Sequence, residues 1–175
     1  MVTKRNPDAK GYTFTKFDDG DLRYLAGIID GEGCFFICKL KKHPKDGYIN
    51  DHYRGILNVT NCDCRLPEWL NEHFPGVSSA CTRATSTKKY ERKVYAWTVS
   101  GFRLHDLCEQ VLPFLVLKKE HCENMIKFRE TYPKVKTGRG NRILTKEELD
   151  IRQECLERSK QLNSRFYLHP LKNNT

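Results

Sequence analysis

The stretch LAGIIDGEG, residues 25–33, decides how this chain can fold. Apolar residues recur at helical spacing between Leu22 and Ile29, which predicts an amphipathic helix over residues 18–30. Three aspartates at the start of this range supply candidates for the N-cap and negative charge in the first turn, and both favour a helix start. The glycines that follow end the helix, because glycine is common just beyond a helix C-terminus.

Two features are unusual for a helix that serves packing alone. Gly27 in its middle costs about 1 kcal/mol of helix propensity relative to alanine, which predicts close packing against another backbone. Asp30 and Glu32 lie at the C-terminal end, where the helix dipole disfavours negative charge. A neighbouring cation would offset this cost, and a hard divalent ion held by carboxylate and carbonyl oxygens suits phosphodiester chemistry. The plainer alternative is an amphipathic helix with a glycine C-cap.

Strand and helix patterns fill the rest of the chain. They predict, in order, strands over 34–42 and 53–61, a helix over 66–74, strands over 78–86 and 93–100, and helices over 102–115, 118–132 and 148–162. We therefore predict an α+β fold of order αββαββα plus a C-terminal helix, with one four-stranded antiparallel sheet and helices on one face. The chain divides into a basic N-terminal arm (1–17), a core domain (18–132), and a basic linker, C-terminal helix and tail (133–175).

The charge balance indicates a polyanionic partner. The 175 residues include 31 Lys and Arg against 22 Asp and Glu, a formal net charge of +9 at pH 7. No apolar run approaches the roughly 18 residues of a membrane span, and the N-terminus lacks the apolar segment of a signal peptide. We expect an intracellular protein with no membrane partner. Its eight cysteines are predicted to be reduced thiols, since their spacing lacks the pairs typical of structural zinc.

The stretch LAGIIDGEG resembles the signature of the LAGLIDADG homing endonucleases, from which it differs at Ile28, Gly31 and Glu32. The predicted order of elements over residues 18–130 is also similar to that family's domain, whose sheet is saddle-shaped. A single copy of the motif implies a homodimer in which two motif helices pack about a two-fold axis. The residues implied at this interface are Leu22, Leu25, Ala26, Gly27 and Asp30.

The resemblance implies an intron-encoded enzyme that cleaves double-stranded DNA at a long, pseudo-palindromic site by divalent-metal-dependent phosphodiester hydrolysis. Mg²⁺, or another divalent metal such as Mn²⁺, would bind the carboxylate of Glu32 and the backbone carbonyl of Gly31. Asn61 would orient the attacking water, since an amide can hydrogen-bond water but is a poor base. Arg65 matches a basic position near the scissile phosphate, and Lys118 would stabilise the charge that develops on that phosphate.

Alternation along the predicted strands separates a core face from a DNA face. In the first strand Phe35 and Ile37 are predicted to face the helices, which leaves Phe36, Cys38 and Leu40 toward DNA. This face is unusually apolar for a surface that reads DNA bases. Either it contacts thymine methyl groups, or the predicted strand phase is shifted by one residue. The candidate DNA-binding residues are Cys38, Leu40, Lys41, Lys42, Arg54, Asn58, Arg83, Arg92, Thr98 and Arg139.

A non-catalytic nucleic-acid binder on the same fold is the alternative. It would be an RNA maturase that assists intron splicing, with intron RNA as its partner, or a DNA-binding regulator. Glu32, Asn61 and Lys118 carry groups that are competent for hydrolysis, which favours the enzyme. The implied compartment is the cytoplasm or an intron-bearing organelle, a chloroplast or mitochondrion.

Overall fold

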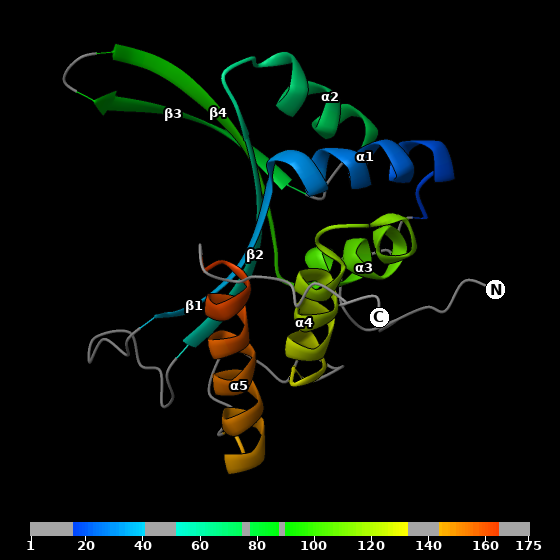
Figure 1. The fold of residues 1–175 in the computed structure, drawn as a ribbon, viewed down its shortest axis with the longest axis vertical. Helices are drawn as coiled ribbons and strands as arrows, with labels where there is room; N and C mark the ends of the chain where they lie inside the picture. Colours follow the sequence, from blue (N-terminus) through cyan, green and yellow to red (C-terminus); the bar gives the residue numbers. More distant parts are fainter. Residues whose placement is uncertain (1–15, 41–51, 75–77, 88–89, 133–143, 165–175) are drawn as a thin grey trace, which may run out of the picture.

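A four-stranded antiparallel sheet and the helices beside it make up the computed structural model (Figure 1). The elements are α1 (Asp19–Glu32), β1 (Gly33–Leu40), β2 (His52–Asn61), α2 (Arg65–His73), β3 (Ser78–Thr87), β4 (Tyr90–Ser100), α3 (Phe102–Val111), η2 (Leu112–Phe114), α4 (Lys119–Glu130) and α5 (Lys146–Leu162). The strand order is β1-β2-β4-β3, which confirms the predicted α+β class and αββαββα order. The described residues are 16–40, 52–74, 78–87, 90–132 and 144–164.

Some predicted residues fall outside this description. Lys41, Lys42 and Arg139 lie outside the described residues, and for Arg83 and Arg92 only the backbone in β3 and β4 is described. Within the described ranges no helix is long and apolar enough to cross a bilayer.

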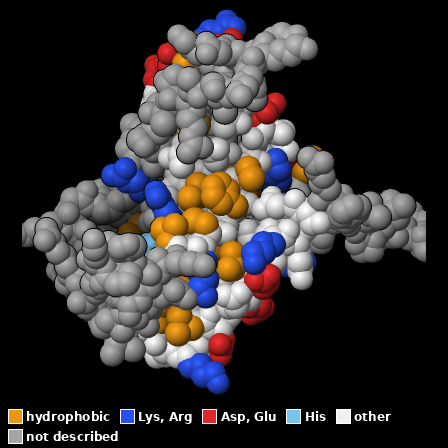
Figure 2. Space-filling view, turned by 90° about the vertical axis from the view of Figure 1, so that its left-hand side faces the viewer, with side chains coloured by type: hydrophobic (Ala, Val, Ile, Leu, Met, Phe, Trp, Pro, Cys, Tyr) orange, Lys and Arg blue, Asp and Glu red, His pale blue; other side chains and the backbone are white. Residues whose placement is uncertain are grey.

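Alternation along the strands gives the sheet one buried and one open face. Phe35, Leu57 and Trp97 come from three adjacent strands and are each at most 1% exposed, beneath the helices. Their neighbours in sequence, such as Phe36 and Ile56, face the other way and are partly exposed. This is the predicted strand phase, so the alternative shifted by one residue is excluded. Figure 2 views the open side, where hydrophobic side chains gather with Lys and Arg beside them.

Helix α1 begins and ends for local reasons. The Asp18 side chain accepts hydrogen bonds from the backbone N–H of Gly20 (2.7 Å) and Asp21 (3.4 Å), which caps the N-terminus. At the other end β1 follows α1 directly, without a loop. A Cβ at Gly33 would lie 2.7 Å from the backbone oxygen of Ile29, so only glycine fits where the helix turns into the strand.

One predicted helix is wrong in part. The sequence predicts a continuous helix over 102–115, but α3 ends at Val111 and a short 3-10 turn follows through Pro113. Proline has no backbone N–H to continue the helical hydrogen bonds, and its ring clashes with the preceding turn. The break directs the chain back across the end of α1 before α4 begins.

Helix α5 covers the free edge of β1. Ile37 donates its backbone N–H to Ser159 Oγ (3.1 Å), and Asn163 Nδ2 donates to the carbonyl oxygen of Phe35 (2.8 Å). Cys155 and Leu156 of the same helix join the main hydrophobic core. Side chains of α5 thus satisfy backbone groups that an edge strand would otherwise leave unpaired.

We expect Gly33→Ala to lower the free energy of unfolding by about 1–3 kcal/mol, the usual cost of overpacking, because its methyl would meet rigid backbone. Gly55→Ala is the matched control, since its methyl would meet the flexible Met125 Sδ at 2.9 Å and the Phe128 ring at 3.2 Å. Urea denaturation of both variants should show the larger loss for Gly33→Ala. An equal or reversed order would contradict this account of the α1–β1 junction.

Candidate active site

The motif acid Asp30 holds the segment that leads into α4. Its carboxylate accepts hydrogen bonds from three successive backbone N–H groups: Val116 (2.9 Å), Leu117 (3.1 Å) and Lys118 (2.9 Å). Asp30 is half-buried, and these bonds occupy both of its oxygens. The Asp30 carboxylate thus ties the end of α1 to the backbone of the segment that leads into α4.

Lys118 makes the reciprocal contact to the end of α1. Its ammonium donates to the carbonyl oxygens of Ile29 (2.8 Å), in the last turn of α1, and of Gly33 (2.5 Å), the first residue of β1. Burial lowers the pKa of Lys118, while the nearby Cys34, Asp30 and Glu32 act to raise it. The predicted catalytic lysine is therefore fixed beside the motif acids by bonds to the backbone.

Glu32 and Gly31 lie at the open end of α1. Both are exposed, and a Cβ at Gly31 would meet nothing within 4 Å. The Glu32 carboxylate is close enough to Lys118 to act on its pKa. A carboxylate and a neighbouring carbonyl with open space around them fit a hard divalent cation that keeps several of its waters. These two residues are thus suited to hold Mg²⁺ or Mn²⁺.

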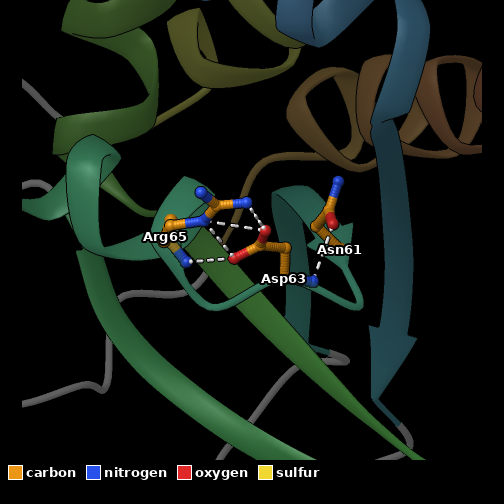
Figure 3. Close-up of polar contacts among 3 residues, drawn as sticks. All are labelled: Asn61, Asp63 and Arg65. Carbon is orange, nitrogen blue, oxygen red and sulfur yellow. Dashed lines mark hydrogen bonds and ion pairs between the residues drawn. The ribbon is translucent and has the colours of Figure 1, made fainter.

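Asn61, Asp63 and Arg65 form a compact turn after β2 (Figure 3). Asn61 Oδ1 accepts from the Asp63 backbone N–H (2.8 Å). Asp63 in turn accepts from the Arg65 backbone N–H (3.0 Å) and from its guanidinium, with Nε at 2.9–3.0 Å and Nη2 at 2.5 Å. Hydrogen bonds from Arg65 lower the pKa of Asp63 to about 2.

This turn meets the end of α1 at one end of the sheet. Gly33 pairs with Val59, so Glu32 just before β1 and Asn61 at the end of β2 lie at the same end of the β1–β2 ladder. Asp63, which engages both Asn61 and Arg65, was not among the predicted site residues. Its signal was the spacing Asp-x-Arg directly before a helix, which is typical of a side chain that binds nearby backbone N–H groups.

The sheet's open face carries the predicted DNA-binding residues that the structure describes. Thr98 Oγ1 donates to Asn58 Oδ1 (2.9 Å), and Arg54 Nη2 donates to Ser100 Oγ (2.9 Å). Leu40 is 49% exposed at the end of β1.

One further group of possible metal ligands is present among the described residues. Ligand atoms of His105, Asp106 and Glu109 on α3 all lie within 4.8 Å of one another. His105 Nδ1 is 3.4 Å from Asp106 Oδ1 and 3.7 Å from Glu109 Oε2, so the ring already contacts the carboxylates beside it.

Comparison with known proteins identifies the architecture. No family model and no curated protein matches the sequence. The structure is similar to the archaeal intron-encoded homing endonuclease I-Vdi141I complexed with DNA, with a TM-score of 0.64 and 17% identity over 85% of this chain and 87% of that one. It is also similar to the homing endonuclease I-CvuI in complex with its target, with a TM-score of 0.54 and 17% identity over 80% and 94% of the two chains. The chain has the LAGLIDADG homing endonuclease fold.

A third similar structure has a longer chain. The LAGLIDADG homing endonuclease I-LtrWI bound to target DNA matches with a TM-score of 0.55 and 20% identity, over 87% of this chain but 49% of that one. The resemblance inferred from LAGIIDGEG is thus confirmed at the level of fold.

Three residues that were predicted to lie at the dimer interface lie in the core of the single chain instead. Leu22, Leu25 and Ala26 are at most 3% exposed in the single chain, because they fill its own hydrophobic core. The solvent-facing side of α1 instead carries exposed Tyr24 and Gly27, with exposed Gly31 one turn further on. Gly27 is exposed in the single chain, and a Cβ there would meet nothing within 4 Å; its predicted place at a dimer interface stays a prediction.

The lowered pKa of Asp63 predicts how its ion pair with Arg65 responds to pH. Because the pKa of Asp63 is lowered from 3.8 to about 2, we expect the carboxylate to stay paired down to about pH 3 and to lose the pair as the pH falls through about 2. A ¹³C NMR titration of the Asp63 carboxyl group would follow this. Arg65→Gln should move the midpoint back toward 3.8, whereas Arg103→Gln, at an exposed position on α3, should leave it near 2. An unchanged midpoint in Arg65→Gln would contradict the pairing.

Proposed function

We propose that this chain forms a homodimeric, divalent-metal-dependent endonuclease that cleaves double-stranded DNA at a specific, pseudo-palindromic site. The proposal rests on one observation at the end of α1. There the exposed Glu32 lies near the Lys118 ammonium, which is held by hydrogen bonds to backbone carbonyls. The net charge of +9, and the Lys and Arg side chains beside the hydrophobic ones on the side that Figure 2 views, suit a polyanionic partner. The similar structures I-Vdi141I, I-CvuI and I-LtrWI are DNA complexes of homing endonucleases.

Each residue of the candidate active site would have its own role in hydrolysis. Mg²⁺ or Mn²⁺ bound by the Glu32 carboxylate and the Gly31 carbonyl would supply positive charge for phosphodiester hydrolysis. Lys118 presents a fixed cation to the charge that develops on the phosphate, and its bonds to Ile29 and Gly33 spare it from reorganising during the reaction. Asn61 has its Oδ1 engaged by the turn, which leaves its Nδ2 group as the donor that would orient a water.

A second copy of the chain would complete the site. We propose that two α1 helices meet along the surface formed by Tyr24, Gly27 and Gly31, where glycines four residues apart allow close approach of two backbones. Val116 and Leu117, 80% and 68% exposed beside Asp30, would extend this contact with apolar surface. A two-fold axis through this contact brings two Glu32 side chains together, one for each DNA strand.

A non-catalytic nucleic-acid binder is the second candidate, and one observation favours it. Asp63 binds the Arg65 guanidinium through both oxygens, which neutralises a cation expected near the scissile phosphate. In that case the fold would serve DNA regulation or intron RNA splicing without cleavage. The enzyme remains the better-supported function, because the Glu32–Lys118 junction is intact.

Glu32→Gln should separate cleavage from binding. We expect Mg²⁺-dependent cleavage to fall by more than about 100-fold, since even outer-shell changes at metal sites cost about 10–100-fold. DNA binding should persist, and the fold should be unchanged or more stable by about 0.3–1 kcal/mol, because an anion leaves the negative end of a helix.

The control for this variant is Glu123→Gln, at an exposed position on α4. Gel-based cleavage of a selected target, with binding measured in parallel, would compare the two variants. Near-native cleavage by Glu32→Gln would place the metal elsewhere, and binding without cleavage by the unmodified chain would favour the non-catalytic candidate.

Gly27→Leu should weaken the dimer without unfolding the chain. A bulky side chain would hold two α1 helices apart, whereas in the single chain it would project into open space. Sedimentation velocity over a range of concentrations should give a dimer for the unmodified chain and for Gln161→Leu, at an exposed position on α5, and a larger monomer fraction for Gly27→Leu. Equal dimer fractions in all three would remove α1 from the interface.

A further inference from the structure

The open face of the β1–β2 pair presents hydrophobic atoms where a DNA reader usually presents polar ones. Phe36, Cys38 and Leu40 of β1 and Ile56 of β2 all point to this face, and we call these four residues the apolar tract. Phe36 and Ile56 are direct cross-strand partners, so their side chains form one continuous surface. Hydrophobic side chains are visible on this side of the molecule (Figure 2).

The polar side chains next to the apolar tract are bonded to one another within the sheet. Thr98 Oγ1 donates to Asn58 Oδ1 at 2.9 Å, and Arg54 Nη2 donates to Ser100 Oγ at 2.9 Å. Cys38 Sγ lies 3.5 Å from the carbonyl oxygen of Arg54, as donor to it. These lateral bonds engage the Asn58 side-chain oxygen, the Thr98 hydroxyl and one Arg54 nitrogen, and beside them the apolar tract offers hydrophobic contact to a ligand.

The surroundings of the apolar tract favour a polyanion over an apolar partner. Arg54 borders it directly, opposite Cys38, and the chain carries a net charge of +9. The major groove of B-DNA is about 12 Å wide and admits a two-stranded β-ribbon, whereas an apolar protein partner would gain nothing from the flanking cations. Of the four base pairs, only A·T and T·A place an apolar group in that groove, the C5-methyl of thymine.

We propose that the apolar tract reads thymine methyl groups, so that each half of the DNA target contains a run rich in A·T pairs opposite β1 and β2. This inference rests on the proposed DNA-binding function and specifies its substrate. Successive outward residues of β1 are about 6.6 Å apart, since a strand rises about 3.3 Å per residue, and base pairs stack about 3.4 Å apart. Phe36, Cys38 and Leu40 therefore meet methyl groups at about every second base pair, over about five base pairs.

Uracil differs from thymine only by the missing C5-methyl, which makes it the matched probe. Binding sites would be selected in Ca²⁺ from two randomised duplex libraries, one made with thymine and one with uracil. We expect the thymine library to yield a run rich in A·T pairs in each half-site, and the uracil library to lose the preference at those positions alone. Single thymine-to-uracil replacements in the selected site should weaken binding about fourfold for each buried methyl.

The variant Ile56→Thr ties this effect to the apolar tract. Threonine keeps the β-branched shape at a partly exposed strand position, so the fold should be retained. At the base pair opposite Ile56, the penalty for uracil should shrink in the variant, because threonine keeps one methyl group but replaces the longer arm of isoleucine with a hydroxyl. Penalties opposite Phe36 should persist. The uracil comparison on the unmodified chain needs no variant and stands by itself.

Three outcomes decide the inference. Uracil penalties that depend on Ile56 support it. Specific binding with equal affinity for thymine and uracil sites overturns the methyl reading and leaves the proposed function intact. Failure to select any specific DNA site overturns both.

Discussion

The C-terminal end of α1 and the segment leading into α4 are joined by hydrogen bonds that run in both directions. Asp30 accepts from the three successive N–H groups of residues 116–118, and Lys118 returns its ammonium to the carbonyls of Ile29 and Gly33. The ammonium also lies at the negative end of the α1 dipole, where a cation is stabilising. Since β1 starts at Gly33 without a loop, this reciprocal contact sets where the sheet departs from the helices. The position of Glu32 depends on it as well.

The candidate active site and the open sheet face are therefore both positioned by strands β1 and β2. The β1–β2 register brings the end of α1 and the turn at Asn61 to the same end of the sheet, while the open face of the same two strands extends away from it. A duplex lying along that face would therefore reach Glu32 and Lys118 at one end and the apolar side chains of Phe36 and Ile56 further along. In our account, recognition and hydrolysis are coupled through the geometry of two strands.

Local patterns in the sequence were sufficient for the order of helices and strands and for the strand phase, because burial on one face imposes a period of 3.6 or 2. They did not place the end of α3 at Val111, where the chain breaks ahead of Pro113. They were not sufficient for the burial of Leu22 and Leu25. An apolar helix stripe fits a dimer surface or the chain's own core equally well, and only the tertiary structure assigns it to the core. The bonds between Asp30 and Lys118 span 88 residues of sequence, so no local pattern encodes them. The Asp63–Arg65 pair was predictable from its spacing but was not singled out.

The central claim is that the end of α1 binds the catalytic metal. It is tested most directly by adding Mn²⁺ to the ¹⁵N-labelled protein bound to DNA, because the paramagnetic ion broadens amide signals close to it. Our account predicts the strongest broadening at Gly31, Glu32 and Gly33, with weaker effects at Asn61. Broadening centred on His105 and Glu109 of α3, or none above background, would contradict it.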